Sequence, residues 1–173
     1  VGFGSYNAPT PLWGMSRSYQ SLFLRKKFTL DDIEWVQSLV MRVDYDDGFV
    51  AYLNGTRIVS ANAAANPGWN AGATGQHDDA SAVTWVSFDA GKYINKLKAG
   101  NNILAIHGLN SGLGSSDMLI NAELSLGQRS GAEIADGVLK YTSPIKLIGD
   151  TTIRTRTMHN GQWSALVEHS FQA

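Results

Sequence analysis

Three carboxylates lie close together in the sequence VDYDDG, at Asp44, Asp46 and Asp47. Carboxylate oxygens are the hard ligands that calcium prefers. They do not complete an EF-hand loop, because the twelfth position counted from Asp44 is Gly55 instead of Glu. The alternative is a tight turn between strands, since Asp tolerates left-handed backbone and Gly48 can supply a positive φ. A structural calcium ion would use Asp46, Asp47 and Asp117, with carbonyls from residues 110–116.

Other carboxylates raise the question of glycoside hydrolysis, which needs an acid and a base or nucleophile on either side of the bond. Asp78 and Asp79 stand in a long polar loop, and Glu123 faces away from the apolar side of its strand. Nothing in the sequence raises the pKa of one such group and leaves another low, so we expect no catalysis. The candidates considered are Asp78, Asp79, Asp89 and Glu123.

The histidines, and the residue types and motifs that the chain lacks, exclude further kinds of metal and catalytic site. His77 has acidic neighbours, but no HxH or HExxH spacing supports a metal site. His107 stands in the apolar run ILAIHGL, where we expect a hydrogen-bonded histidine in the core or lining a cleft. The chain has no cysteine, which excludes disulfides and thiolate ligands. It also has no nucleophile elbow and no phosphate-binding loop.

Aromatic residues are the best candidates for ligand contact. A sugar ring can stack its C–H face on an aromatic ring, while its hydroxyl groups bond to Asp, Asn, Arg or Gln. Trp69 stands in the long loop 61–82, and loops of this length are often functional. Packing in the core or anchoring of the loop is the alternative use of these tryptophans. The predicted carbohydrate site consists of Trp69, Asn70, Gln76, His77, Asp78 and Trp85.

Composition excludes several partners. The net charge is -1 and only 17% of the 173 residues are charged. There is no basic stripe for nucleic acid or for a membrane surface. No run of 18 apolar residues is present, so we expect no membrane insertion. We expect no required cofactor beyond a structural calcium ion. The chain starts at Val1 without a signal-peptide pattern, which we interpret as a fragment of a larger chain, covalently linked to other domains.

Short strands separated by turn residues indicate an all-β sandwich or barrel. Asn54-Gly55 is the strongest hairpin signal. Residues 92–97 are expected to form one helical turn. A shift in composition at residues 127–137 predicts two domains, 1–128 and 129–173, with a hairpin around residues 159–162 in the second. The predicted strands are 22–28, 39–45, 49–53, 57–60, 83–88, 103–109 and 118–126, with 151–158 and 164–171 forming the C-terminal hairpin.

The order of motifs resembles a known family over about residues 12–126. LWGMSRSYQSLFLRKKF is followed by VDYDDG, FVAYLNGTRI, WVSFDAGKYINKLKAGNNILAIHGLN and SSDMLINAEL. This order is similar to the jelly-roll sugar-binding sandwich of β-galactosidase-type hydrolases. It resembles still more the galactose-binding-like domains of large secreted bacterial proteins. The tail YTSPIKLIGDTTIRTRTMHNGQWSAL resembles the closing half of an immunoglobulin-like chitobiase C-terminal domain.

The resemblance implies an antiparallel jelly-roll β-sandwich with a C-terminal hairpin. It also implies a secreted or cell-surface bacterial protein in which this domain accompanies others. We expect a non-catalytic module that binds a polysaccharide or oligosaccharide. A structural or interaction spacer without sugar affinity is the main alternative, and a glycoside hydrolase is the remote one.

Overall fold

The computed structural model describes residues 1–6, 8–127, 149–155, 157–159, 162–163 and 167–172. The chain divides into two compact units, Val1–Arg129 and Ser130–Ala173. The boundary predicted between residues 128 and 129 lies outside the described residues. Among the helices of the described part, none is long and apolar enough to cross a bilayer.

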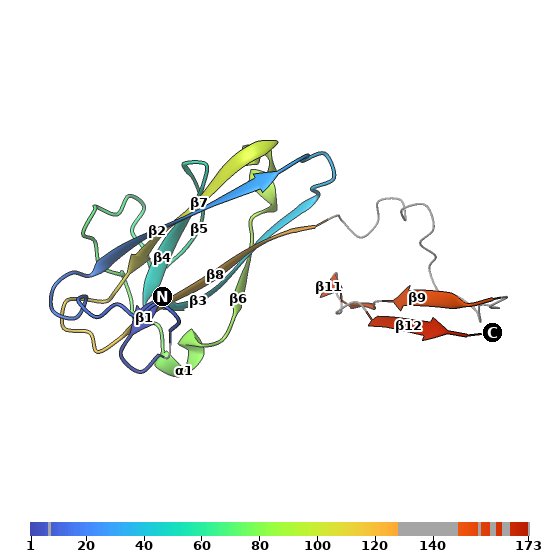
Figure 1. Cartoon of the computed structure of the whole chain (residues 1–173). Helices are drawn as coiled ribbons and strands as arrows, with labels where there is room; N and C mark the ends of the chain where they lie inside the picture. Colours follow the sequence, from blue (N-terminus) through green and yellow to red (C-terminus); the bar gives the residue numbers. More distant parts are fainter. Residues whose placement is uncertain (7, 128–148, 156, 160–161, 164–166, 173) are drawn as a thin grey trace. The chain divides into compact units, whose positions relative to one another are not determined.

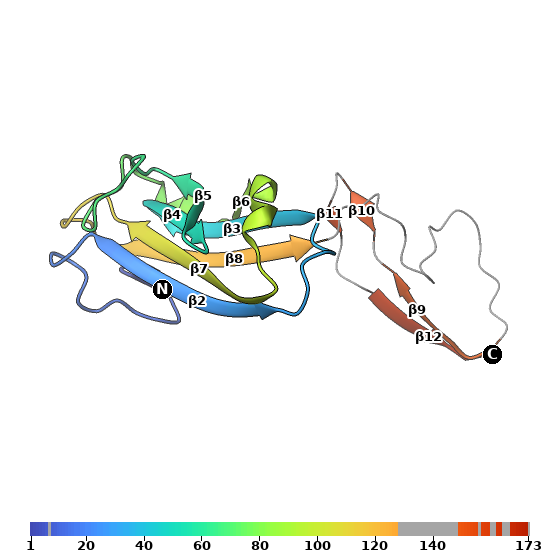
Figure 2. The same cartoon turned by 90° about the horizontal axis from the view of Figure 1, so that it is seen from above.

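The first unit is a sandwich of two four-stranded antiparallel sheets, which form the upper and lower layers of Figure 1. The long strands of both sheets run along a common direction (Figure 2), as in aligned sandwiches. One sheet has the order β1 (Gly2–Phe3), β8 (Met118–Gly127), β3 (Ser38–Asp46) and β6 (Val86–Asp89). The other has the order β2 (Ser21–Leu30), β7 (Gly100–Leu109), β4 (Gly48–Leu53) and β5 (Thr56–Ala61).

The pairing of the eight strands is that of a jelly roll. β1 pairs with β8, β2 with β7, β3 with β6 and β4 with β5, as when one long hairpin is wound into two sheets. The predicted all-β antiparallel sandwich is confirmed. The closing hairpin of the winding is the one predicted at Asn54-Gly55, where φ is 50° and 84°. Two successive positive φ values are those of a type I′ turn, which matches the twist of the flanking strands.

The connection from β3 to β4 differs from the sequence prediction. We expected a turn with positive φ at Gly48, but none of the positive φ values among the described residues falls at 46–48. The prediction is wrong because β3 and β4 belong to different sheets, so the chain crosses between layers there and makes no hairpin. A cis peptide bond joins Asp46 to Asp47.

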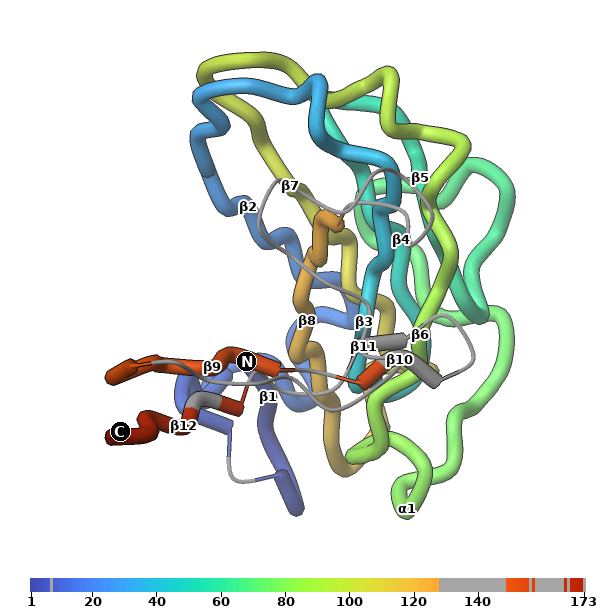
Figure 3. The backbone as a smooth tube through the Cα atoms, turned by 90° about the vertical axis from the view of Figure 1, so that its right-hand side faces the viewer, coloured from blue at the N-terminus to red at the C-terminus, as the bar shows by residue number. Residues whose placement is uncertain are grey.

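The long loop after β5 ends in α1 (Asp79–Ala82), as Figure 3 shows. This helix was not predicted, and the strand expected at 83–88 is observed at Val86–Asp89. Asp78 begins the helix by accepting a hydrogen bond from the Ser81 backbone N–H at 3.2 Å. The helical turn expected at 92–97 is present as the 3₁₀ helix η1 (Gly91–Lys96).

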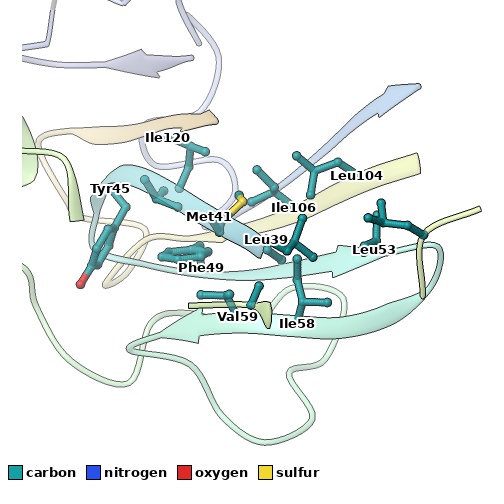
Figure 4. Close-up of a cluster of buried hydrophobic side chains, with 14 of the residues drawn as sticks. Leu39, Met41, Tyr45, Phe49, Leu53, Ile58, Val59, Leu104, Ile106 and Ile120 are labelled. Carbon is teal, nitrogen blue, oxygen red and sulfur yellow. The ribbon is translucent and has the colours of Figure 1, made fainter. Parts of the chain in front are cut away.

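Side chains from both sheets meet in the core between the layers (Figure 4). Phe49 packs edge-on against Tyr45, with ring centroids 5.1 Å apart. β8 alternates as predicted: Met118 and Ile120 are buried in the core, and Leu124 packs against it. The residues of Figure 4 that carry labels are Leu39, Met41, Tyr45, Phe49, Leu53, Ile58, Val59, Leu104, Ile106 and Ile120.

The second unit contains the predicted C-terminal hairpin. β9 (Thr151–Thr155) pairs with β12 (Val167–Phe171). Between them β10 (Met158–His159) pairs with β11 (Gln162–Trp163). The two pairs form separate two-stranded sheets whose registers differ by one residue. Residues 160–161 of the turn predicted around 159–162 lie outside the described residues.

Candidate functional site

A groove of about 480 Å³ lies on the face of the β2-β7-β4-β5 sheet that points away from the core. Its floor comes from three neighbouring strands, and the loop after β5 forms a wall. Exposed aromatic rings and several polar groups share this surface, which is the usual composition of a ligand site. The groove is lined by Phe23, Leu24, Arg25, Tyr52, Asn54, Gly55, Pro67, Trp69, Ile103, Ala105, Ile106 and His107.

Strand alternation builds the floor. Phe23 pairs with His107 and Arg25 pairs with Ala105 across β2 and β7. Because the side-chain period of a strand is two, these four residues share one face, while Leu24 and Ile106 turn toward the core. The rings of Phe23 and His107 stack at 4.3 Å with an interplanar angle of 20°. Phe23 nevertheless keeps 50% of its surface exposed, so one ring face is available to a ligand.

Trp69 on the wall is 82% exposed, and its loop is tied down on both sides. The Arg57 guanidinium donates to the carbonyl oxygens of Ala64 and Ala65. On the other side of Trp69, the Ser21 hydroxyl donates to the Ala71 carbonyl at 2.7 Å. The indole is thus held over the sheet by its backbone while its ring stays in solvent.

The hydrogen bonds of His107 fix its ring. The Ser21 hydroxyl donates its one hydrogen to the Ala71 carbonyl oxygen. The contact of 2.9 Å between Ser21 Oγ and His107 Nε2 therefore requires that Nε2 carries a proton and donates it to Oγ. Burial lowers the pKa of His107. At neutral pH the imidazole is therefore uncharged, and its Nδ1 carries a lone pair that can accept a hydrogen bond.

Not all polar groups in the groove are available. Asn54 is used by the fold, because its amide donates to the Lys96 carbonyl and the Asn102 side chain and accepts from the Ile103 N–H. Arg25 has no hydrogen bond or ion pair in the described part of the chain, and the same holds for the Tyr52 hydroxyl. The Arg25 guanidinium and the Tyr52 phenol are left to meet a ligand, whereas His107 is only 3% exposed beneath Phe23.

A second hollow of about 500 Å³ lies between the edges of β2 and β8, where the sandwich is open. Its walls are mainly aliphatic, including Leu104, Ile120 and Leu124. Arg25, Lys26 and Asn121 also line it, but none of its lining residues is an exposed aromatic residue on which a sugar ring could stack. The groove with Trp69 is the better candidate.

The structure separates the residues that the sequence grouped around Trp69. Trp69 lies in the groove, whereas Asn70 contributes its backbone carbonyl to Gln20 Nε2 at 3.0 Å. Gln76 is exposed, and its carbonyl accepts from Asn62 Nδ2 at 3.4 Å. Neither of the two amide residues lines the groove.

His77 and Asp78 serve the fold at the far end of the same loop. The His77 ring stacks on Tyr45 at 4.1 Å, its Nδ1 contacts the Tyr45 carbonyl at 2.6 Å, and its backbone N–H donates to Asp47. Asp78 is the N-cap of α1. Both positions therefore anchor the loop and do not face the groove.

Trp85 belongs to the opposite sheet. It stands directly before β6, and the guanidinium of Arg42 lies 4.9 Å from its ring centroid. Because β6 and β3 are in the sheet that does not form the groove, Trp85 and Trp69 cannot contact one ligand ring together.

The predicted calcium residues are also divided. Oxygen atoms of Asp46, Asp79 and Asp117 lie within 4.8 Å of one another. Asp47 points elsewhere: its carboxylate accepts the backbone N–H of Ser111 at 2.6 Å and of His77 at 3.2 Å. Asp79 takes its place in the cluster, brought there by α1.

The cluster fits a calcium ion in spacing and in charge. Two oxygens bound to one calcium ion at 2.3–2.6 Å lie at most about 5 Å apart. Burial raises the pKa of Asp46 to about 7, and the hydrogen bond from the Tyr6 hydroxyl, at 2.7 Å, only partly opposes this. Asp44, on the same face of β3, has one buried carboxylate oxygen without a partner in the described part of the chain. A cation would relieve the unfavourable charge at Asp46.

Sequence reasoning missed Phe23, Arg25 and Tyr52. Residues 103–109 were expected to be covered on both faces, but Ile103 is 38% exposed and Ala105 lies on the groove floor. The available signal was the alternation in LFLRKKF, where Phe23 stands on the face opposite Leu22 and Leu24.

Comparison with known proteins gives distant likenesses. No family model and no curated protein matches the chain. A β-D-mannosidase from Dictyoglomus thermophilum is 21% identical, with a TM-score of 0.32, over 53% of this chain and 9% of that one. An α-L-rhamnosidase from Aspergillus terreus is 16% identical, with a TM-score of 0.39, over 66% and 13%. A β-D-glucuronidase from Dictyoglomus thermophilum is 11% identical, with a TM-score of 0.36, over 88% and 30%. At these TM-scores we draw no function from them.

Proposed function

We propose that this chain is a non-catalytic carbohydrate-binding module of a larger secreted bacterial protein, and that the groove with Trp69 holds the glycan. The observation that carries the proposal is the exposure of Trp69, 82%, beside a half-exposed Phe23. Large aromatic rings normally bury most of their surface. Two such rings left in solvent, on one groove, favour a ligand with flat apolar faces.

The polar side chains of the groove also favour a carbohydrate ligand. Sugar hydroxyls both donate and accept hydrogen bonds. The Arg25 guanidinium donates and the Tyr52 hydroxyl does both. These groups stand on paired strands and the loop is tied to the same sheet, so little has to be ordered on binding.

A non-catalytic role is favoured by the distribution of acids. No carboxylate lines the groove among the described residues. Hydrolysis of a glycosidic bond normally uses two carboxyl groups facing each other across the bond. The four carboxylates considered from the sequence have other contacts: Glu123 with Arg42, Asp89 with the Gly91 N–H, Asp78 with α1, and Asp79 in the acidic cluster.

Affinity electrophoresis of the complete chain through gels with soluble β-glucans, mannans, xylans and pectins tests the proposal. Trp69→Ala should abolish retardation, a loss of at least about tenfold in affinity, because its ring is the main stacking surface. Trp85→Ala is the matched control, since it removes the same side chain from the opposite sheet. The folded chain binding none of these glycans would favour the spacer alternative, and equal losses in the two variants would place the site elsewhere.

A further inference from the structure

The groove lies on a sheet whose charges all have one sign. β2, β7, β4 and β5 together contain no Asp or Glu. Residues 62–77, which include the wall of the groove, contain none either. The cations of these strands are Arg25, Lys26, Lys27 and Arg57. Because the whole chain has a net charge of -1, this sheet is more positively charged than the chain as a whole.

Arg25 is the cation that faces the groove. It lies opposite Ala105 and next to Phe23 on the floor, and it is exposed. In the described part of the chain no carboxylate pairs with it. Lys27 follows on the same strand face, opposite Ile103, and extends the positive charge along the rim. By contrast, Arg57 is occupied by the carbonyls of its own loop.

We infer that, if the groove binds glycans as proposed above, its ligands are acidic glycans whose carboxylate or sulfate group pairs with Arg25. A guanidinium offers two parallel N–H donors, which match the two oxygens of either anion. The rings of Phe23 and Trp69 stack on the sugar that carries the carboxylate or sulfate, so one sugar residue of the glycan contacts both the rings and Arg25. A neutral glycan would leave Arg25 without a counter-charge in the bound state.

Calorimetry on the complete chain tests the inference with two matched ligand pairs. One pair is oligogalacturonate and its fully methyl-esterified form, and the other is dextran sulfate and dextran. The parent chain should bind the anionic member of at least one pair about tenfold more tightly than the neutral member. This preference should shrink between 20 and 200 mM NaCl, because salt screens exposed charges. The pair that shows the preference identifies the anion.

Arg25→Gln should remove the preference, because the anionic member loses an ion pair while the neutral member loses at most one hydrogen bond. Lys26→Gln is the control, because it removes one positive charge from the adjacent position but lines the hollow between β2 and β8. Trp69→Ala should weaken both members of a pair. Equal affinity of the parent for both members, or equal effects of the Arg25 and Lys26 variants, would overturn the inference while carbohydrate binding stands. No binding of any member by the parent would overturn both.

Discussion

The two sheets of the sandwich differ in charge and in whether their charged groups are hydrogen-bonded within the chain. The groove sheet has four cations and no carboxylate. The β1-β8-β3-β6 sheet has one cation, Arg42, and the carboxylates Asp44, Asp46, Asp89 and Glu123. Each of these carboxylates accepts a hydrogen bond from the chain itself: from Asn121, Tyr6, the Gly91 N–H and Ser125 respectively.

The comparison suggests where to look for a binding face in a fold of this kind. Each carboxylate of the β1-β8-β3-β6 sheet already accepts a hydrogen bond from the chain, so a ligand would have to displace contacts that the fold makes. On the groove sheet, Arg25 and Tyr52 have no such contacts among the described residues. Unused hydrogen-bonding groups next to exposed rings mark a binding face better than polarity alone.

The largest expected effect concerns Asp47, which lies at the crossing from β3 to β4 and holds the loops that follow β5 and β7. Its carboxylate is 4% exposed and accepts two backbone N–H groups, from Ser111 and His77. Asp47→Ala should lower the free energy of unfolding by about 3 kcal/mol, since both donors lose a charged partner. Urea denaturation followed by tryptophan fluorescence measures this. Asp89→Ala, which removes an exposed carboxylate with one such bond, should cost less than about 1 kcal/mol. Equal losses would mean that Asp47 does not hold the crossing.

The strands of the sandwich could be predicted from the sequence, whereas the groove and the acidic cluster could not. Alternating strands and the Asn54-Gly55 turn were predictable because they depend on local backbone preferences. The groove was not, because it needs the register that places Phe23 opposite His107, 84 positions along the chain. The acidic cluster likewise depends on α1, whose four residues are too few to leave a periodic pattern. Trp69 was found because an aromatic residue in a long loop has few packing options.

The next effect is a pH dependence on the acidic side. The pKa of Asp46 is raised by burial from 3.8 to about 7. The folded chain therefore holds this proton at pH values where the unfolded chain has released it. The stabilisation is complete below about pH 4 and is lost as the pH rises through 7. Denaturation midpoints should show the chain less stable at pH 8 than at pH 5, by about 2 kcal/mol. Asp46→Asn should flatten this difference, and a slope that persists in this variant would assign the effect to another group.

Calcium should replace the proton on the same cluster. At pH 8, millimolar calcium should raise the Tm of the chain by about 3–6 °C, because the ion binds the folded state alone. Asp79→Asn should remove most of the increase, since Asp79 supplies the third oxygen. Differential scanning calorimetry with and without EDTA gives the comparison. If Tm at pH 8 does not change with calcium, the cluster is not a metal site.

The smallest effect is expected on the exposed face of the acidic sheet, at Glu123. Its carboxylate lies 3.6 Å from the Arg42 guanidinium, and the side chains of Arg42 and Glu123 are 39% and 49% exposed. Exposed ion pairs contribute about 0–1 kcal/mol, because water and salt screen them. Glu123→Gln should therefore change the free energy of unfolding by less than about 0.5 kcal/mol and leave glycan affinity unaltered. A clear loss of glycan binding in this variant would show that the sheet with Trp85 also contacts the ligand. The assignment of glycan binding to the β2-β7-β4-β5 sheet alone would then be wrong.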